Sequence, residues 1–60
     1  MFKEYDHVKM PDGKKGIIVD FTHDENGKFA IVEDDERRPV NGHYIFPLYD
    51  CRLSDLEKID

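Results

Sequence analysis

The sequence contains only one cysteine, no tryptophan and no long apolar run. The single cysteine and the lack of a long apolar run each exclude a class of protein. Because Cys51 is alone, an internal disulfide and a C-x-x-C redox or zinc motif are excluded, and we expect a packed thiol. The longest apolar stretch, residues 16–19, is far shorter than the ~20 residues that span a bilayer. We therefore expect no membrane association.

The sequence also shows no pattern typical of an export signal and few patterns typical of a helix. Residues 1–6 hold no basic segment followed by an apolar stretch, so the sequence predicts a cytoplasmic location. No long window keeps an apolar stripe at the helical period, and glycine or proline interrupts most of the chain. The exception is a single 3₁₀ turn predicted at 54–56, where Ser54 and Glu57 have the spacing of a capping box.

Three dipeptides that favour tight turns divide the chain, namely Asp12-Gly13, Asn26-Gly27 and Asn41-Gly42. The segments between these turns are rich in β-branched and aromatic residues. We predict strands at about residues 5–10, 15–22, 28–34, 36–40 with 43–46, and 56–59. This pattern is typical of a single all-β domain, residues 1–60, that is built as a five-stranded meander.

Residues 15–34 are predicted to form a β-hairpin, and its register depends on the geometry of its turn. A two-residue Asn-Gly turn places Ala30 beside Phe21. A bulged turn with Gly27 at positive φ places Phe29 there instead. We favour the bulged turn because it aligns the larger side chains.

The glycine and apolar positions of the first half resemble the opening three strands of SH3-like and KOW-like barrels, in the order Val8-x-x-x-x-Gly13-x-x-Gly16-x-Ile18-x-x-Phe21 and then Phe29-Ala30-Ile31-Val32. Residues 53–59 resemble the 3₁₀ turn and final strand that close such barrels, including those of several small bacterial and phage families. The resemblance implies a five-stranded SH3-like barrel with a 3₁₀ turn before its last strand. It indicates a fold rather than a function.

Neither a metal site nor a catalytic site is predicted. The three histidines are never separated by two or four positions, and a structural zinc site needs four ligands in closed geometry. The carboxylates around Asn26-Gly27 are too few for a calcium loop. Hydrolysis needs a nucleophile, a base and an oxyanion hole in a sheltered cleft, which so short a chain hardly provides. We expect no cofactor and no enzymatic activity.

Acidic charge and aromatic side chains are concentrated in different parts of the chain. Residues 23–36 carry six acids against Lys28 alone, and they account for the formal charge of −5. Three aromatic residues follow, Tyr44, Phe46 and Tyr49. In strand alternation Tyr44 and Phe46 share a face, so these rings either fill the core or form a contact surface.

We predict a non-catalytic protein-interaction or accessory module whose partner is another protein, with a basic surface. Its expected contact residues are Tyr44, Phe46, Tyr49, Asp34, Asp35, Glu36, Arg37 and Arg38.

The alternative is a KOW-like nucleic-acid-binding domain, in which a tyrosine stacks on a base. Its expected contacts are Lys14, Lys15, Arg37, Arg38 and Arg52. Because the chain is acidic, these cations have to lie on one side of the domain to bind phosphates at physiological salt. Lysines 14–15 and arginines 37–38 on one rim favour nucleic acid, and opposite rims favour the interaction module.

Overall fold

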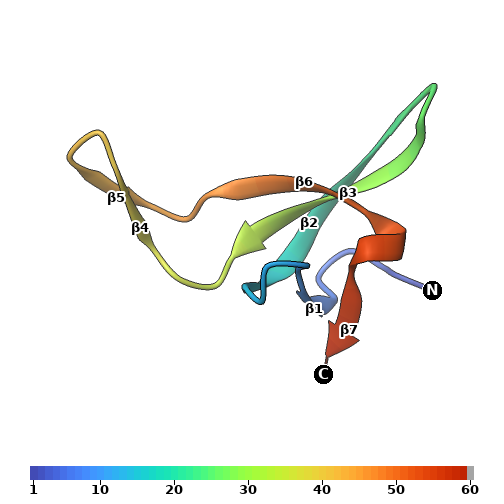
Figure 1. The fold of residues 1–60 in the computed structure, drawn as a ribbon, viewed down its shortest axis with the longest axis horizontal. Helices are drawn as coiled ribbons and strands as arrows, with labels where there is room; N and C mark the ends of the chain where they lie inside the picture. Colours follow the sequence, from blue (N-terminus) through green and yellow to red (C-terminus); the bar gives the residue numbers. More distant parts are fainter. Residues whose placement is uncertain (60) are drawn as a thin grey trace.

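A computed structural model describes residues 1–59 as an antiparallel β-structure, in which five strands form one sheet in the order β6-β3-β2-β1-β7 (Figure 1). Residue 60 of the predicted domain lies outside the described residues. The strands of the sheet are β1 (His7–Lys9), β2 (Lys15–Asp24), β3 (Gly27–Asp34), β6 (Leu48–Arg52) and β7 (Glu57–Ile59). A 3₁₀ turn, η1 (Leu53–Asp55), precedes β7. The remaining strands, β4 (Arg38–Val40) and β5 (His43–Ile45), form a separate hairpin.

The all-β prediction is confirmed, but within residues 1–59 the sheet does not close into a barrel. Strands β6 and β7 are its two edges, and no pairing joins them. The 3₁₀ turn and the last strand lie within one residue of their predicted positions. The strand order and this closing turn therefore define an open, five-stranded antiparallel sheet.

The predicted segment 36–40 with 43–46 does contain strands, but it is not the fourth strand of the sheet. Residues 36–40 and 43–46 do not join the main sheet, because β4 and β5 pair only with each other. On the side of β3 away from β2, the neighbouring strand is β6, which the sequence did not predict. Proline lacks the N–H that a central strand has to donate, so Pro39 suits a two-stranded edge hairpin, and β6 begins immediately after Pro47.

The hairpin of β2 and β3 has the register that we did not favour. Phe21 lies opposite Ala30, and the pairing shifts by one residue between Ile18 and Asp20. The bulge turns Asp20 outward, where its carboxylate accepts a hydrogen bond from the backbone N–H of Phe21 at 2.8 Å. Without the bulge, Asp20 would follow Ile18 onto the core face and bury a charge. Desolvation of one carboxylate therefore outweighs the alignment of large side chains.

Gly27 ends the turn between β2 and β3 with a φ of +120°, and the sequence predicted its positive φ correctly. Because a β-branched residue resists this conformation, we expect Gly27→Val to lower the free energy of unfolding by about 1–3 kcal/mol. No atom lies within 4 Å of the position that a Cβ would take, so the loss comes from the backbone alone. Urea unfolding followed by circular dichroism measures it. Thr22→Val, on the exposed side of the same hairpin, serves as the control and is expected to change little; a wild-type midpoint for Gly27→Val would contradict the prediction.

The core is a single cluster of six buried apolar residues, Val8, Met10, Ile18, Ala30, Val32 and Leu56. Half-buried residues pack around this cluster, among them Phe21 and two residues of β6, Tyr49 and Cys51. Cys51 is thus a partly packed thiol, as predicted. No residue of β4 or β5 belongs to the core, so the separate hairpin contributes little to holding the sheet together.

Candidate functional site

Residues 37–47, here called the arm, project away from the rest of the described chain, here called the body (Figure 1). Strands β4 and β5 contact chiefly each other. Asn41 and Gly42 form the two-residue turn at the tip with φ values of 49° and 82°, as the Asn-Gly dipeptide predicts. A lone two-stranded hairpin is only marginally stable in water. The arm therefore depends on an anchor at its root or on a partner along its surface.

Apolar side chains are exposed along both faces of the arm. Tyr44 is 69% exposed, and Val40, Ile45 and Phe46 each exceed 40%. The pairing places Val40 and Ile45 on one face and Tyr44 on the other. The interpretation that Tyr44 and Phe46 fill the core is therefore wrong, and the alternative, an aromatic contact surface, matches their positions.

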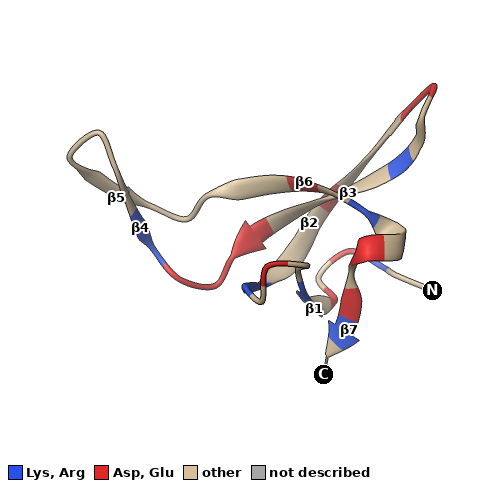
Figure 2. Ribbon diagram, viewed as in Figure 1, with Lys and Arg blue, Asp and Glu red and all other residues tan. Residues whose placement is uncertain are grey.

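The arm also differs from the body in charge. Figure 2 shows basic residues at the start of the arm and no acidic residue in it. Arg37 and Arg38 are two of the nine Lys and Arg residues, while the remaining seven share the rest of the chain with all fourteen Asp and Glu residues. The arm thus carries a formal charge of +2 and the rest of the chain a formal charge of −7, which together give −5.

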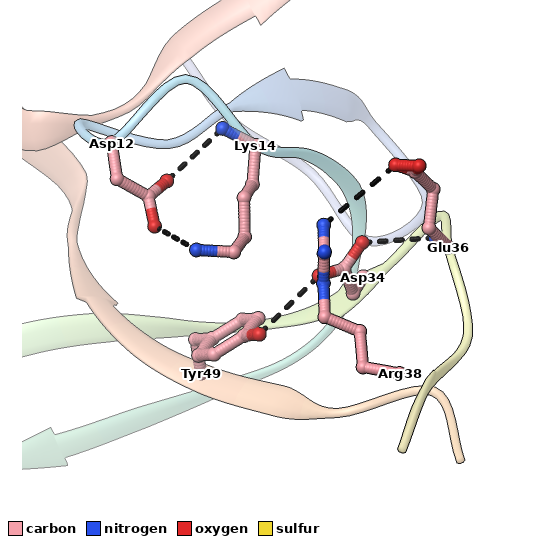
Figure 3. A network of polar contacts seen from close by, with 6 residues as sticks. All are labelled: Asp12, Lys14, Asp34, Glu36, Arg38 and Tyr49. Atoms are coloured by element: carbon pink, nitrogen blue, oxygen red, sulfur yellow. Dashed lines mark hydrogen bonds and ion pairs between the residues drawn. The ribbon is translucent and has the colours of Figure 1, made fainter. Parts of the chain in front are cut away.

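The root of the arm is anchored by a buried carboxylate, Asp34, which is only 2% exposed (Figure 3). Its oxygens accept hydrogen bonds from Arg38 Nε at 2.8 Å, from the Glu36 backbone N–H at 2.9 Å and from the Tyr49 hydroxyl at 3.3 Å. Its backbone N–H donates to the Pro47 carbonyl at 2.9 Å, which joins the end of β3 to the last residue of the arm. Asp34 is therefore a structural anchor that leaves almost no exposed surface for the partner contact predicted from the sequence.

The pKa of Asp34 reflects opposing influences. Burial alone would raise it, but the hydrogen bonds from Arg38, Glu36 and Tyr49 and the charge of Arg38 outweigh burial and hold it below the ordinary value of 3.8. In return, the Asp34 carboxylate raises the pKa of the Arg38 guanidinium. Both groups are ionised at neutral pH, so a charged pair fixes the direction in which the arm leaves the body.

Asp35 and Glu36, which together with Asp34 are here called the acidic strip, are only partly free. Asp35 Oδ2 lies 2.6 Å from His7 Nε2. The backbone N–H of Asp35 donates to the Lys15 carbonyl at 3.0 Å. The Glu36 carboxylate lies 3.7 Å from Arg38 Nη2. The strip therefore ties the arm to the sheet as well as contributing negative charge to the surface.

The cations expected to contact nucleic acid are brought together only in part. Lys14 and Arg38 lie on the same side of the body, near the Tyr49 ring and hydroxyl (Figure 3). Each already has an acidic partner, since Lys14 pairs with Asp12 and Arg38 with Asp34. The hydrogen bond from Lys14 lowers the pKa of Asp12 and in turn raises that of Lys14. One condition for a phosphate-binding rim is met, but these two charges are neutralised within the chain.

Arg37 and Arg52 each face an aromatic ring. The Arg37 guanidinium carbon is 6.0 Å from the centre of the Tyr44 ring on the arm. That of Arg52 is 5.6 Å from the centre of the Phe29 ring on the body. Cations at this distance from a ring are attracted to its face. Arg37 and Tyr44 thus form an exposed pair on the arm.

A second surface feature is a groove between the β1–β2 turn, β3 and the β6–η1 segment, with a volume of about 410 Å³. We call it the acidic groove, and its lining residues are Met10, Pro11, Asp12, Phe29, Tyr49, Asp50, Cys51, Arg52 and Asp55. Burial raises the pKa of the Cys51 thiol, and the nearby carboxylates of Asp12, Asp50 and Asp55 raise it further. The thiol is therefore protonated at neutral pH and a weak nucleophile.

Within residues 1–59, no group of three or more His, Cys, Asp and Glu side chains is arranged to hold a metal ion. No helix in this part of the chain has the length and apolar character needed to cross a membrane. Comparison with known protein families, with curated proteins and with solved structures finds no match.

Sequence reasoning missed the anchor and the groove. A signal for the anchor was present, because Asp34 follows Ala30 and Val32 at alternate positions and so shares their buried face. The favoured register put Asp34 on the opposite face. The groove had no comparable signal, since it joins segments that are distant in the sequence and depends on β6, which was not predicted.

Proposed function

We propose that this chain is a non-catalytic protein-interaction module that binds its partner through the arm. The observation that carries the proposal is the arm's surface, which exposes Tyr44, Ile45 and Phe46 without contributing to the core. Leu48, at the root, extends the same apolar surface and is 59% exposed. Exposed apolar clusters of this kind mark interaction sites, and aromatic residues supply most of the binding energy at such sites.

The charge of the arm favours a partner with an acidic surface. The sequence predicted a basic partner because of its acidic residues, but Asp34 is buried, Asp35 lies against His7 and Glu36 lies against Arg38 of the same chain. Arg38 is paired with Asp34, but no Asp or Glu of residues 1–59 forms an ion pair with Arg37, and the arm itself contains no acid, so the arm is attracted to negative potential through Arg37. We therefore propose an acidic contact surface on the partner, which the arm's apolar residues desolvate.

Photo-cross-linking from the arm tests the proposal. A benzophenone amino acid at His43, an exposed arm position, is expected to give protein adducts in cells that express the chain, and nuclease treatment should leave these adducts intact. The same cross-linker at Thr22, an exposed body position, is the matched control and should give none of them. Identical adducts from both positions, or adducts that nuclease removes, would show that the arm is not a protein-binding element.

A single substitution should separate binding from folding. We expect Tyr44→Ser to lower the yield of the His43 adducts at least about tenfold, as truncation of a central interface aromatic does. Because Tyr44 packs against no core residue, the free energy of unfolding of the Tyr44→Ser protein should stay within about 0.5 kcal/mol of wild type. Undiminished adducts from a folded Tyr44→Ser protein would contradict the proposal.

Nucleic-acid binding is the second candidate function, and the exposed pair of Arg37 and Tyr44 favours it. A cation beside an aromatic ring is the arrangement on which proteins stack unpaired bases. Fluorescence anisotropy with short single-stranded RNA and DNA, at low and physiological salt, tests this candidate. Binding that survives physiological salt and is lost in Arg37→Glu would favour nucleic acid over protein. The absence of binding would leave the interaction module.

We also propose that the sheet is an open relative of the SH3-like barrel. The support is the strand order β6-β3-β2-β1-β7 together with the 3₁₀ turn before the last strand. In this interpretation the arm is an insertion between the third and fourth strands of the barrel. Such a fold accommodates many functions, so the binding proposal depends on the arm rather than on the fold.

A further inference from the structure

The acidic groove has an apolar floor and a negative rim. Met10 is buried, and Phe29, Tyr49 and Cys51 are half-buried around it, so the floor offers apolar contact. Its volume of about 410 Å³ falls within the range of about 300–1,000 Å³ that is usual for sites enclosing a bound group. The rim carries three carboxylates, those of Asp12, Asp50 and Asp55, against the single cation of Arg52.

Two of the rim carboxylates are left without a cation in the described chain. Lys14 pairs with Asp12, but no Lys, Arg or His nitrogen of residues 1–59 lies within 4.0 Å of Asp50 or Asp55. Arg52 faces the Phe29 ring instead. The groove therefore keeps negative potential above its apolar floor, and it suits a group that is both cationic and aromatic.

The arm is the element of this chain that has those properties. It combines the exposed pair of Arg37 and Tyr44 with further apolar side chains, and it contains no acid. The anchor at Asp34 holds the arm so that it points away from the body, so the arm does not fill the groove of its own chain (Figure 1). Arm and groove are complementary in charge and in apolar character.

We infer that the arm of one copy docks in the acidic groove of a second copy, so that the chain self-associates. This inference rests on the proposed function, because it names the partner of the same arm. Arg37 of the arm approaches Asp50 and Asp55, and the arm's aromatic residues cover the apolar floor. Docking removes from water both the arm's apolar surface and the exposed floor of the groove.

Sedimentation equilibrium of the intact chain, from micromolar to millimolar concentration, tests the inference. The mass is expected to rise above the 7.1 kDa of a single chain and to fall toward this value as added salt screens the charges. A single-chain mass at every concentration would overturn the inference. If the arm then still gives cross-links to a different protein, the proposed function stands; if it gives none, both fail.

Reversing the charges identifies the two surfaces. Arg37→Glu on the arm and Asp50→Arg with Asp55→Arg in the groove should each weaken self-association at least about tenfold. Mixing the two variants should restore association, because the acidic arm of one then meets the basic groove of the other. No recovery in the mixture would overturn the inference.

A matched control separates the groove from net charge. Glu4→Arg with Glu25→Arg changes the formal charge by the same amount as the groove variant, at two exposed body residues outside the groove. This control should leave the association constant within about threefold of wild type, since exposed charges far from a contact act only through screened fields. A loss equal to that of the groove variant would contradict docking in the groove.

Discussion

Asp34→Ala is expected to lower the free energy of unfolding by roughly 2–4 kcal/mol, because it removes the buried acceptor of three hydrogen bonds, one of them from a charged group. A chain of this length has a total stability of about 3–9 kcal/mol, so the variant is close to unfolding at room temperature. Thermal and urea unfolding, followed by circular dichroism, measure the loss.

The neighbouring position provides the control for this variant. Asp35→Ala removes an exposed carboxylate that pairs with His7, and exposed pairs contribute at most about 1 kcal/mol. If Asp34→Ala were no more destabilising than Asp35→Ala, Asp34 would not be the anchor. In a folded Asp34→Asn protein, we further expect amide hydrogen exchange to be faster than in wild type. The increase should be larger in the arm than in β2, because the ion pair with Arg38 is lost.

The pH dependence of stability follows from the lowered pKa of Asp34. Its pKa is lower in the folded chain than in the unfolded one, so the carboxylate stabilises the fold fully above about pH 4. This contribution is lost as the pH falls through the folded-state pKa. Asp34→Asn should therefore show a smaller loss of stability on acidification than wild type. Equal acid sensitivity of the two proteins would contradict this assignment.

Gly16→Ala is expected to have an effect of similar size for a different reason. A Cβ at Gly16 would lie 2.4 Å from the Glu33 carbonyl oxygen and 2.7 Å from Val32 Cγ1. Because one of these atoms belongs to the backbone of β3, relief requires the sheet itself to shift. Overpacking typically costs about 1–3 kcal/mol and more where the backbone has to move, so we expect a loss of about 3 kcal/mol.

Lys15→Ala, at the exposed position next to Gly16, is the control for this substitution and should change stability by less than about 0.5 kcal/mol. Gly16 also pairs with Asp34 across β2 and β3, so the displaced backbone carries the anchor with it. In a folded Gly16→Ala protein, amide shifts should therefore extend from β3 to the arm residues. A wild-type melting temperature would show that the sheet absorbs the methyl group without strain.

Local turn chemistry and apolar alternation predicted much of the fold. Asn41-Gly42 and Gly27 adopt the positive φ values that such residues favour, and the residues around Leu56 form the predicted turn and last strand. These features depend on neighbours in the sequence. Strands β6 and β7 are the two unpaired edges of the sheet. Whether such edges pair depends on contacts between distant segments, which local sequence patterns do not predict.

The candidate site was predicted in its residues more than in its arrangement. Tyr44, Phe46 and Arg37 are exposed and Arg37 faces the Tyr44 ring, but the acidic residue expected beside them, Asp34, is buried. That difference arises from the bulge in β2, because one extra residue exchanges the two faces of a strand. The alternation of Asp34 with Ala30 and Val32 showed that these three residues share a face of β3, but the choice of the buried face depended on the register with β2.

The hydrogen bond between the Asp34 N–H and the Pro47 carbonyl makes the arm exchangeable. The chain leaves the sheet and returns to it at almost the same point, so segments of other lengths and sequences fit between these two residues without disturbing the strand order. Any replacement segment needs a cationic side chain that reaches the Asp34 carboxylate. A designed peptide grafted at this place would be displayed on the same support.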